Sequence, residues 1–355
     1  MKRNNSLDCL RVLACFLVIL LHVSAGYVID NIENYNFQFT VGNFFDSMSR
    51  ICVPLFVMLS GAFLLENPKN KNFTNFYKKS LSKIGLPTFI WSLIYVLYSY
   101  IIGIGGEVIK NKPFDYLSPI KNWILGKPFY HLWYLYMIIG LYILTPLIIR
   151  LKEEIKEKTF FKISIILLIL SIGISAYNSL VWLIEFIIYL GYFMIGSSLK
   201  NYFIKKTFNL KISILISILS GISIFFITEY FVKYNLFNKT LYFYGNLTPF
   251  VIVGSIFTFI TFLNLKIKNN LFSNLAHHSF NIYLIHAGLL SALNIILNIL
   301  NLKFNGVWYI PLMSLVIFSS SYIGSKIIGV ILNKILLKNS KLNEGISFTT
   351  KLIKE

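Results

Sequence analysis

Long apolar segments recur along the chain and constrain its fold more than any other feature. Four of the clearest lie at residues 12–21, 163–174, 212–227 and 282–300. Because a helix rises about 1.5 Å per residue, about 20 apolar residues cross a hydrocarbon core about 30 Å thick. Only 13% of the 355 residues are charged, whereas an average soluble domain has about 25%. These features exclude an ordinary water-soluble enzyme and predict an all-α fold, a polytopic bundle of transmembrane helices.

Ten segments are predicted to cross the membrane, with no soluble domain or repeat between them. The boundaries we expect are 9–28, 44–65, 84–103, 131–149, 163–178, 180–199, 212–232, 247–265, 279–300 and 308–333. They predict one transmembrane domain over residues 1–337, followed by a polar tail at 338–355. The connection at 104–130 has room for a short interfacial or re-entrant helix around 116–125.

The basic residues are distributed unevenly among the segments that connect these spans. The chain has 33 Lys and Arg against 14 Asp and Glu, a net charge of +19. With a cytoplasmic N-terminus, 23 of the basic residues lie in inner segments, seven in outer segments and three within spans. This distribution follows the positive-inside rule, so we expect both termini in the cytoplasm and a multi-pass protein among the lipids of the cell (plasma) membrane. Because topology accounts for the charge, nucleic acid is not an expected partner.

The first span carries two ionisable side chains on one helix face. Arg11 and His22 are 11 residues apart, about 1100° of helical rotation, so they point within about 20° of each other. About 16 Å along the helix axis separates the arginine, near the cytoplasmic side, from the histidine, near the outer side. Ionisable groups within a membrane are costly and often functional. The pair therefore indicates a site, although a snorkelling arginine and a hydrogen-bonded interfacial histidine would give the same pattern.

The second span combines a charge pair with residues that alter helix geometry. Asp46 and Arg50 are spaced i,i+4 and are able to neutralise each other. Pro54 is expected to kink the helix and free a carbonyl. Ser60 and Gly61 allow the close approach of either another helix or a ligand, and the sequence leaves both possibilities open.

Two later spans add histidines and aromatic residues. His131 opens the fourth span beside Trp133, at a depth comparable to that of His22, while Tyr283 and His286 lie in the ninth span. Interfacial anchoring of His131 and a purely structural hydrogen bond of His286 remain open alternatives to a functional role. The histidines lack i,i+4 spacing and an acidic co-ligand motif, so no metal site is expected.

Four stretches, in this order, resemble the membrane acyltransferase-3 family, which includes peptidoglycan and lipopolysaccharide O-acetyltransferases. They are Leu10-Arg11 through His22 (an arginine, ten residues and a histidine), Val53 to Gly61, Tyr130 to Leu135, and Ser279 to His286. The resemblance covers roughly residues 6–335. It departs from the family pattern at Pro54, where many members carry an aspartate. The fused extracellular esterase-like domain of many members is also absent, so any second transfer step is expected to be internal or to use another protein.

The resemblance implies an integral membrane O-acyltransferase that acts on a cell-envelope carbohydrate. The donor would be cytoplasmic acetyl-CoA or another acyl-CoA, and no bound cofactor is expected. The acceptor would be a hydroxyl of peptidoglycan, lipopolysaccharide, an exopolysaccharide or a lipid-linked glycan. We assign His22 as base or acyl carrier and Arg11 as a ligand of the donor. The acceptor region is assigned to a wider set of residues: Arg50, Ser60, His131, Trp133, Tyr283 and His286.

Two other classes of function are compatible with this composition. An exporter or flippase of a polysaccharide or lipid-linked glycan would line its path with similar residues, but it should show coupled ionisable groups and broken helices in repeated halves. A non-catalytic scaffold would not require Arg11 and His22 on one face. We see no clear inverted repeat, and the intramembrane charges cluster in the first two spans, so acyl transfer is the preferred hypothesis.

Overall fold

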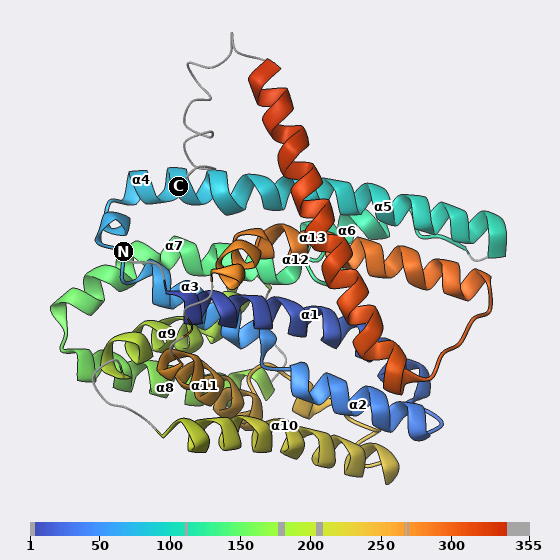
Figure 1. Cartoon of the computed structure of the whole chain (residues 1–355), viewed down its shortest axis with the longest axis horizontal. Coiled ribbons are helices and arrows are strands. Elements are labelled where there is room, and N and C mark those ends of the chain that lie inside the picture. Colours follow the sequence, from blue (N-terminus) through green and yellow to red (C-terminus); the bar gives the residue numbers. More distant parts are fainter. Residues whose placement is uncertain are drawn as a thin grey trace.

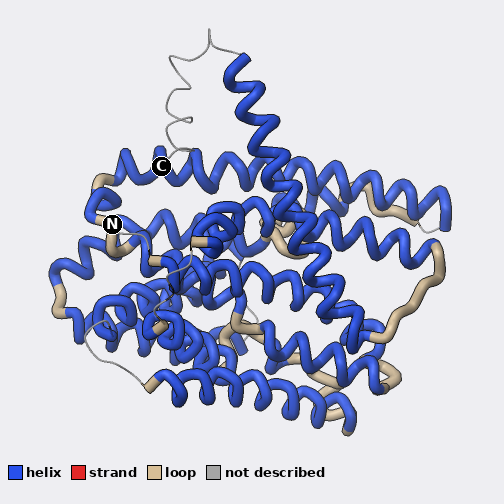
Figure 2. The backbone as a smooth tube through the Cα atoms, viewed as in Figure 1, coloured by secondary structure: helices blue, strands red, loops and turns tan. Residues whose placement is uncertain are grey.

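The computed structural model describes residues 4–110, 113–176, 182–203, 209–265, 267 and 270–338. These residues form helices and contain no strand, which confirms the predicted all-α class (Figure 2). The α-helices are α1 (Asn5–Asn31), α2 (Phe37–Ser49), α3 (Cys52–Leu64), α4 (Phe73–Ser80), α5 (Leu86–Lys110), α6 (Ser118–Ile124), α7 (Trp133–Glu154), α8 (Glu157–Ala176), α9 (Leu190–Phe203), α10 (Leu210–Lys233), α11 (Pro249–Asn264), α12 (Leu271–Ile299) and α13 (Gly306–Lys338). Shorter 3-10 helices cover Pro68–Lys71, Trp182–Tyr189 and Tyr242–Tyr244, and a π-helix at Leu81–Gly85 joins α4 to α5. Beyond Lys338, the tail predicted at 338–355 lies outside the described residues.

The described helices cross the bundle back and forth. Nine of the helical segments described are long and apolar enough to span a membrane. A tenth crossing consists of the 3-10 helix Trp182–Tyr189 followed by the short helix α9. The predicted polytopic bundle of about ten spans is therefore confirmed. We call the end at which α1 begins the inner end and the opposite end the outer end, names that follow the orientation predicted from charge.

Helix α1 lies among other helices in the bundle, whereas α8 and α10 turn one side outward (Figure 1). α1 packs against α2, α3, α11, α12 and α13, and its Leu7, Leu10 and Ala14 side chains are fully buried. By contrast, α8 exposes Ile169 and α10 exposes Leu215. Lipid tails are as apolar as these side chains, so outward-facing leucine and isoleucine are expected on a membrane helix. The polar groups that carry chemistry are consequently concentrated inside.

The second crossing is broken, but not where the sequence analysis expected it. α2 ends at Ser49 and α3 begins at Cys52, so the break lies at Arg50 and Ile51 rather than at Pro54. Pro54 instead occupies the first turn of α3, where a missing N–H matters little. Its ring would clash with the carbonyl four residues earlier, that of Arg50, if one helix continued through this point. The proline thus breaks the helix before its own position, and this frees the Arg50 region from the regular helix.

Two glycines allow α3 and α9 to pack backbone against backbone. A Cβ atom built on Gly61 would lie 1.7 Å from the Phe193 carbonyl oxygen, and one on Gly196 would lie 2.0 Å from the Met58 carbonyl oxygen. Both contacts are impossible for a side chain, so only glycine fits at either position. Of the two possibilities that the sequence left open at Gly61, the structure shows the close approach of a second helix.

Candidate active site

Three histidines that are far apart in the sequence meet in one cluster. His22 comes from α1, His131 from the segment just before α7, and His286 from α12. The ring centre of His286 lies 5.5 Å from that of His22 and 5.2 Å from that of His131. The cluster forms because α1 and α12 pack side by side.

The hydrogen bonding of His286 identifies its tautomer. Its Nδ1 atom lies 2.6 Å from the Tyr283 carbonyl oxygen, and a carbonyl only accepts, so Nδ1 carries the proton. Nε2 therefore bears a lone pair, and it has no hydrogen-bond partner among the described residues. Both ring nitrogens of His131 also lack a hydrogen bond of normal geometry within the described part of the chain. Buried polar atoms are rarely left unpaired in a folded protein, so these nitrogens mark a place for a polar ligand or water.

Tyrosines surround the histidines and fix their positions. The Tyr283 hydroxyl donates a hydrogen bond to the His131 carbonyl oxygen. The Tyr95 hydroxyl donates to the Leu284 carbonyl oxygen at 2.6 Å, and its ring centre lies 4.9 Å from that of His131. Whereas His131 and His286 are buried, His22 is only half-buried and its ring meets the edge of Tyr130 at 4.8 Å. Tyr130 is 45% exposed, so the cluster is closest to the surface on its His22 side.

Aromatic rings and a serine connect the histidine cluster with the surroundings of Arg11. The ring centres of Tyr283 and Tyr134 are 5.5 Å apart. The Ser60 hydroxyl interacts by hydrogen bonding with Tyr134 and with Tyr142, and the charge of Arg11 acts on both tyrosines. Ser60 therefore lies beside two tyrosines that are near Arg11.

Arg11 lies in a basic region at the inner end. Its Cζ atom is 5.0 Å from the centre of the Phe63 ring, and the Lys200 Nζ atom is 5.2 Å from the same centre. Lys200 also donates a hydrogen bond of 3.0 Å to the Ala62 carbonyl oxygen near the C-terminal end of α3. Cations are favourable at such a helix end. Lys200 does not stand out in the sequence, because lysines at the inner ends of spans are expected from the positive-inside rule.

Glu66 holds this inner end together. Its carboxylate forms an ion pair with Lys152 and accepts hydrogen bonds from Ser197 and Asn201. Burial is the largest influence on Glu66 and favours its neutral form, but these hydrogen bonds and the Lys152 charge together outweigh it, so the pKa of Glu66 is lowered. The carboxylate joins α7 and α9 to the end of α3.

We predict that Glu66 makes stability depend on pH on the acid side. Because its pKa is lower folded than unfolded, its contribution is fully present above the unfolded value of about 4.3 and is lost as pH falls through the lowered folded value. Glu66→Gln should flatten the fall in melting temperature below about pH 5. The control is Glu153→Gln, since Glu153 pairs with Lys71 but is 48% exposed. Equal acid profiles for wild type and Glu66→Gln would contradict this prediction.

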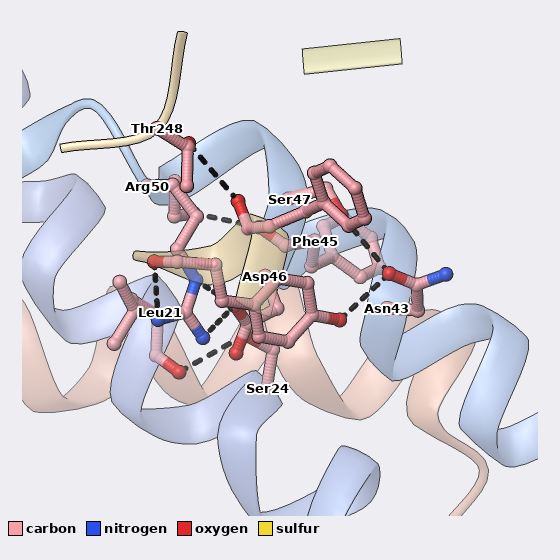
Figure 3. A network of polar contacts seen from close by, with 11 residues as sticks. Leu21, Ser24, Asn43, Phe45, Asp46, Ser47, Arg50 and Thr248 are labelled. Carbon is pink, nitrogen blue, oxygen red and sulfur yellow. Dashed lines mark hydrogen bonds and ion pairs between the residues drawn. The ribbon is translucent and has the colours of Figure 1, made fainter. Parts of the chain in front are cut away.

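Arg50 belongs to a second buried network (Figure 3). Its guanidinium forms an ion pair with the fully buried Asp46, as the i,i+4 spacing predicted, and lies 4.0 Å from the centre of the Tyr244 ring. The Tyr244 hydroxyl donates to Asn43 Oδ1 at 2.6 Å, and Asn43 Nδ2 donates to the Glu229 carboxylate at 2.7 Å. Glu229 also accepts hydrogen bonds from the hydroxyls of Tyr35 and Thr40. Arg50, at the end of α2, is therefore joined to Tyr244 and, through Tyr244 and Asn43, to Glu229 of α10.

The residues selected from the sequence are thus brought together in part. His22, His131, Tyr283 and His286 are in one cluster, and the Trp133 ring lies 6.5 Å from that of Tyr134 beside it. Ser60 lies beside Tyr134, and Arg50 belongs to the network of Asp46 and Tyr244. Tyr130 and Tyr134 were missed, since tyrosines near span ends are usually interfacial. Tyr95 was missed because nothing in its local sequence distinguishes it from other apolar residues of the span 84–103. No group of three or more His, Cys, Asp or Glu in the described ranges is arranged to hold a metal ion.

Comparison with known proteins places the chain in a family. A family model described as an acyltransferase domain matches residues 4–326, nearly the whole chain. The protein is therefore a membrane acyltransferase, and it belongs to the acyltransferase-3 family. Neither the curated proteins nor the solved structures gave a match.

Proposed function

We propose that this acyltransferase moves an acetyl or similar acyl group from cytoplasmic acyl-CoA to a hydroxyl of a cell-envelope carbohydrate, with His22 as base or acyl carrier. The observation that carries the proposal is the histidine cluster, in which His22 lies on the same face of α1 as Arg11. In this cluster, the ring nitrogens of His131 and Nε2 of His286 have no hydrogen bond of normal geometry among the described residues. Arg11 lies about 16 Å from His22 along α1, a distance that covers much of an extended pantetheine arm. One helix therefore aligns a phosphate-binding cation with an imidazole.

The transfer step needs one group that accepts a proton and returns it. In the base mechanism, the acceptor oxygen attacks the thioester carbonyl carbon and the C–S bond breaks. The hydroxyl proton passes to the neutral His22 imidazole, which then protonates the leaving sulfur of CoA. In the carrier mechanism, a His22 nitrogen attacks the thioester carbonyl carbon, the C–S bond breaks, and the imidazole N–H proton passes to the sulfur of CoA. The acceptor hydroxyl then attacks the acyl-imidazole, the C–N bond breaks, and the hydroxyl proton returns to the imidazole. Both routes end with the same ester, free CoA thiol and regenerated histidine.

The basic residues at the inner end suit the phosphate groups of CoA. The charged groups of Arg11 and Lys200 both contact the Phe63 ring, at 5.0 and 5.2 Å from its centre. Arginine stays charged at any physiological pH and binds phosphate oxygens in a bidentate manner. With the CoA phosphates held there, the thioester would extend past Ser60 and Tyr134 toward His22.

An exporter or flippase is the alternative that the sequence left open. It requires a continuous path for a large glycan and coupled ionisable residues along it. The buried His131 and His286 instead lie together with His22 in one cluster. The chain also belongs to an acyltransferase family. Acyl transfer is therefore the better-supported function.

The decisive experiment is acyl transfer by purified protein in lipid. Radiolabelled acetyl-CoA should be supplied with and without a crude cell-envelope glycan, and the label should then be sought in glycan and on protein. We expect label in the glycan and stoichiometric release of CoA. A folded sample that neither transfers label nor releases CoA would exclude acetyl-CoA as donor, and a glycan transport assay would follow.

Arg11 supplies a separate prediction for the donor side. Arg11→Ala should raise the KM for acetyl-CoA at least tenfold, because a charge-assisted phosphate contact of about 1.5–3 kcal/mol is lost. Arg11→Lys should be intermediate, since lysine keeps the charge but not the bidentate geometry. The matched control is Lys211→Ala, a basic residue at the inner start of α10. An unchanged KM for acetyl-CoA in folded Arg11→Ala would exclude this residue from the donor site.

A further inference from the structure

A cavity of about 780 Å³ lies at the outer end of the bundle. That volume is within the range of about 300–1,000 Å³ typical of small-molecule sites. Its wall combines aromatic, amide and charged side chains, among them Lys127, Trp133, Glu185, Tyr189, Tyr242 and Asn246. Nothing in the donor site or the histidine chemistry accounts for this cavity.

The wall formed by residues 240–248 is held in place from three sides. The Asn246 carbonyl oxygen accepts a 2.7 Å hydrogen bond from the Tyr192 hydroxyl. Its side-chain amide donates to the Tyr189 hydroxyl at 3.2 Å. Arg50 donates a hydrogen bond of 3.3 Å to the carbonyl oxygen of Tyr244, within the same segment 240–248. The cavity is therefore preformed, and Arg50 fixes its wall as a positioning residue.

The cavity also adjoins the histidine cluster. Trp133 lines the cavity and is separated from His131 by one residue. The Trp133 ring centre lies 6.1 Å from that of Tyr189 on the cavity side and 6.5 Å from that of Tyr134 on the cluster side. A sugar in the cavity would thus contact Trp133, which is adjacent to the ring of Tyr134 beside the histidine cluster.

The lining favours an uncharged sugar over the other molecules in the reaction. Its charged residues are one lysine and one glutamate, which leave no net charge. A polyphosphate such as CoA would need several cations, and an acyl chain would not favour a wall that presents amide and carboxylate groups. Pyranose rings, by contrast, pack their C–H faces on aromatic side chains and exchange hydrogen bonds with carboxylate and amide groups.

We propose that this outer cavity binds an uncharged pyranose unit of the acceptor carbohydrate, packed on Trp133 and Tyr242 and hydrogen-bonded to Glu185 and Asn246. The assignment rests on the proposed acyl transfer. It adds where the acceptor binds and which chemical class of acceptor the enzyme selects.

The test separates acceptor binding from donor use. Tyr242→Ala and Glu185→Gln are compared with wild type in lipid, with fractionated cell-envelope glycan and acetyl-CoA each varied in turn. We expect the KM for the glycan to rise about tenfold, and the KM for acetyl-CoA to change less than twofold. Tyr234→Ala is the matched control, because Tyr234 is an exposed tyrosine at the outer end of α10 that does not line the cavity. Unchanged glycan KM in both cavity variants, or an equal rise in both KM values, would overturn the proposal.

A binding measurement without donor distinguishes this proposal from the proposed function. Fluorescently labelled glycan is titrated onto wild type, the two cavity variants and Tyr234→Ala, and fluorescence anisotropy is recorded. Binding by wild type and Tyr234→Ala that weakens about tenfold in the cavity variants would support the site, even if no acyl group were transferred. Wild-type binding that the cavity variants retain in full, or no binding by wild type, would overturn the site and leave the transfer assay to decide the function.

Discussion

His22→Ala is expected to lower acyl transfer to the glycan at least 100-fold. A positioned general base contributes about 10²–10⁴-fold to a rate, and loss of an acyl carrier would cost at least as much. The fold should survive, since the ring contacts of His22 are limited to Tyr130 and His286 in the described residues. The measurement is the initial rate of labelled acetyl transfer at saturating donor, with the melting temperature recorded on the same sample.

His277→Ala is the matched control for this variant. His277 is an exposed histidine near the inner end of α12, away from the cluster, and we expect its rate to stay within twofold of wild type. Full transfer by folded His22→Ala would remove the imidazole from the mechanism. Label retained on wild-type protein, but absent from the variant, would favour the acyl-imidazole route over simple base catalysis.

The second large effect is expected on stability, at the contact between α3 and α9. Gly61→Ala or Gly196→Ala would place a methyl group against a backbone carbonyl at 1.7 or 2.0 Å. Backbone atoms cannot move aside as a flexible side chain can, so we expect a loss of more than about 3 kcal/mol or failure to fold. The measurement is the yield of monodisperse protein and its melting temperature in detergent.

Gly173→Ala gives the contrast for these two variants. Gly173 lies within α8, and a Cβ atom there would meet nothing within 4 Å. Alanine in a helix is favoured over glycine by roughly 0.5–1 kcal/mol, so this variant should be as stable as wild type or slightly more so. If Gly61→Ala and Gly173→Ala melted alike, the close backbone packing of α3 and α9 would be wrong.

Helix periodicity explains which parts of the site were accessible from sequence. Arg11 and His22 share one helix, so the rise and rotation per residue fix their separation and direction without any knowledge of other helices. The Asp46 and Arg50 pair was predicted for the same reason and is present. The helix break expected from Pro54 is present and lies at Arg50 and Ile51, because the proline ring acts on the carbonyl four positions before it.

Other features depend on segments that are far apart in the sequence. Glu229 of α10 accepts hydrogen bonds from the α2 residues Thr40 and Asn43, which are 189 and 186 residues away in the sequence. Lys200 is an ordinary lysine at the inner end of a span when judged from the sequence, yet its charged group contacts the same Phe63 ring as Arg11. These pairings depend on how each helix is rotated about its axis and shifted along it, and local periodicity does not specify either quantity.

The membrane-spanning helices and the alignment of Arg11 with His22 could be predicted from the sequence, because lipid requires long apolar helices and each helix has a regular geometry. Helix packing was needed to show that His131 and His286 join His22, that Gly61 contacts Phe193, and that an open cavity lies beside Trp133. The physical reason is that lipid provides little preference for one helix neighbour over another. Close packing of small residues and interhelical hydrogen bonds select the neighbours, and these depend on the whole bundle.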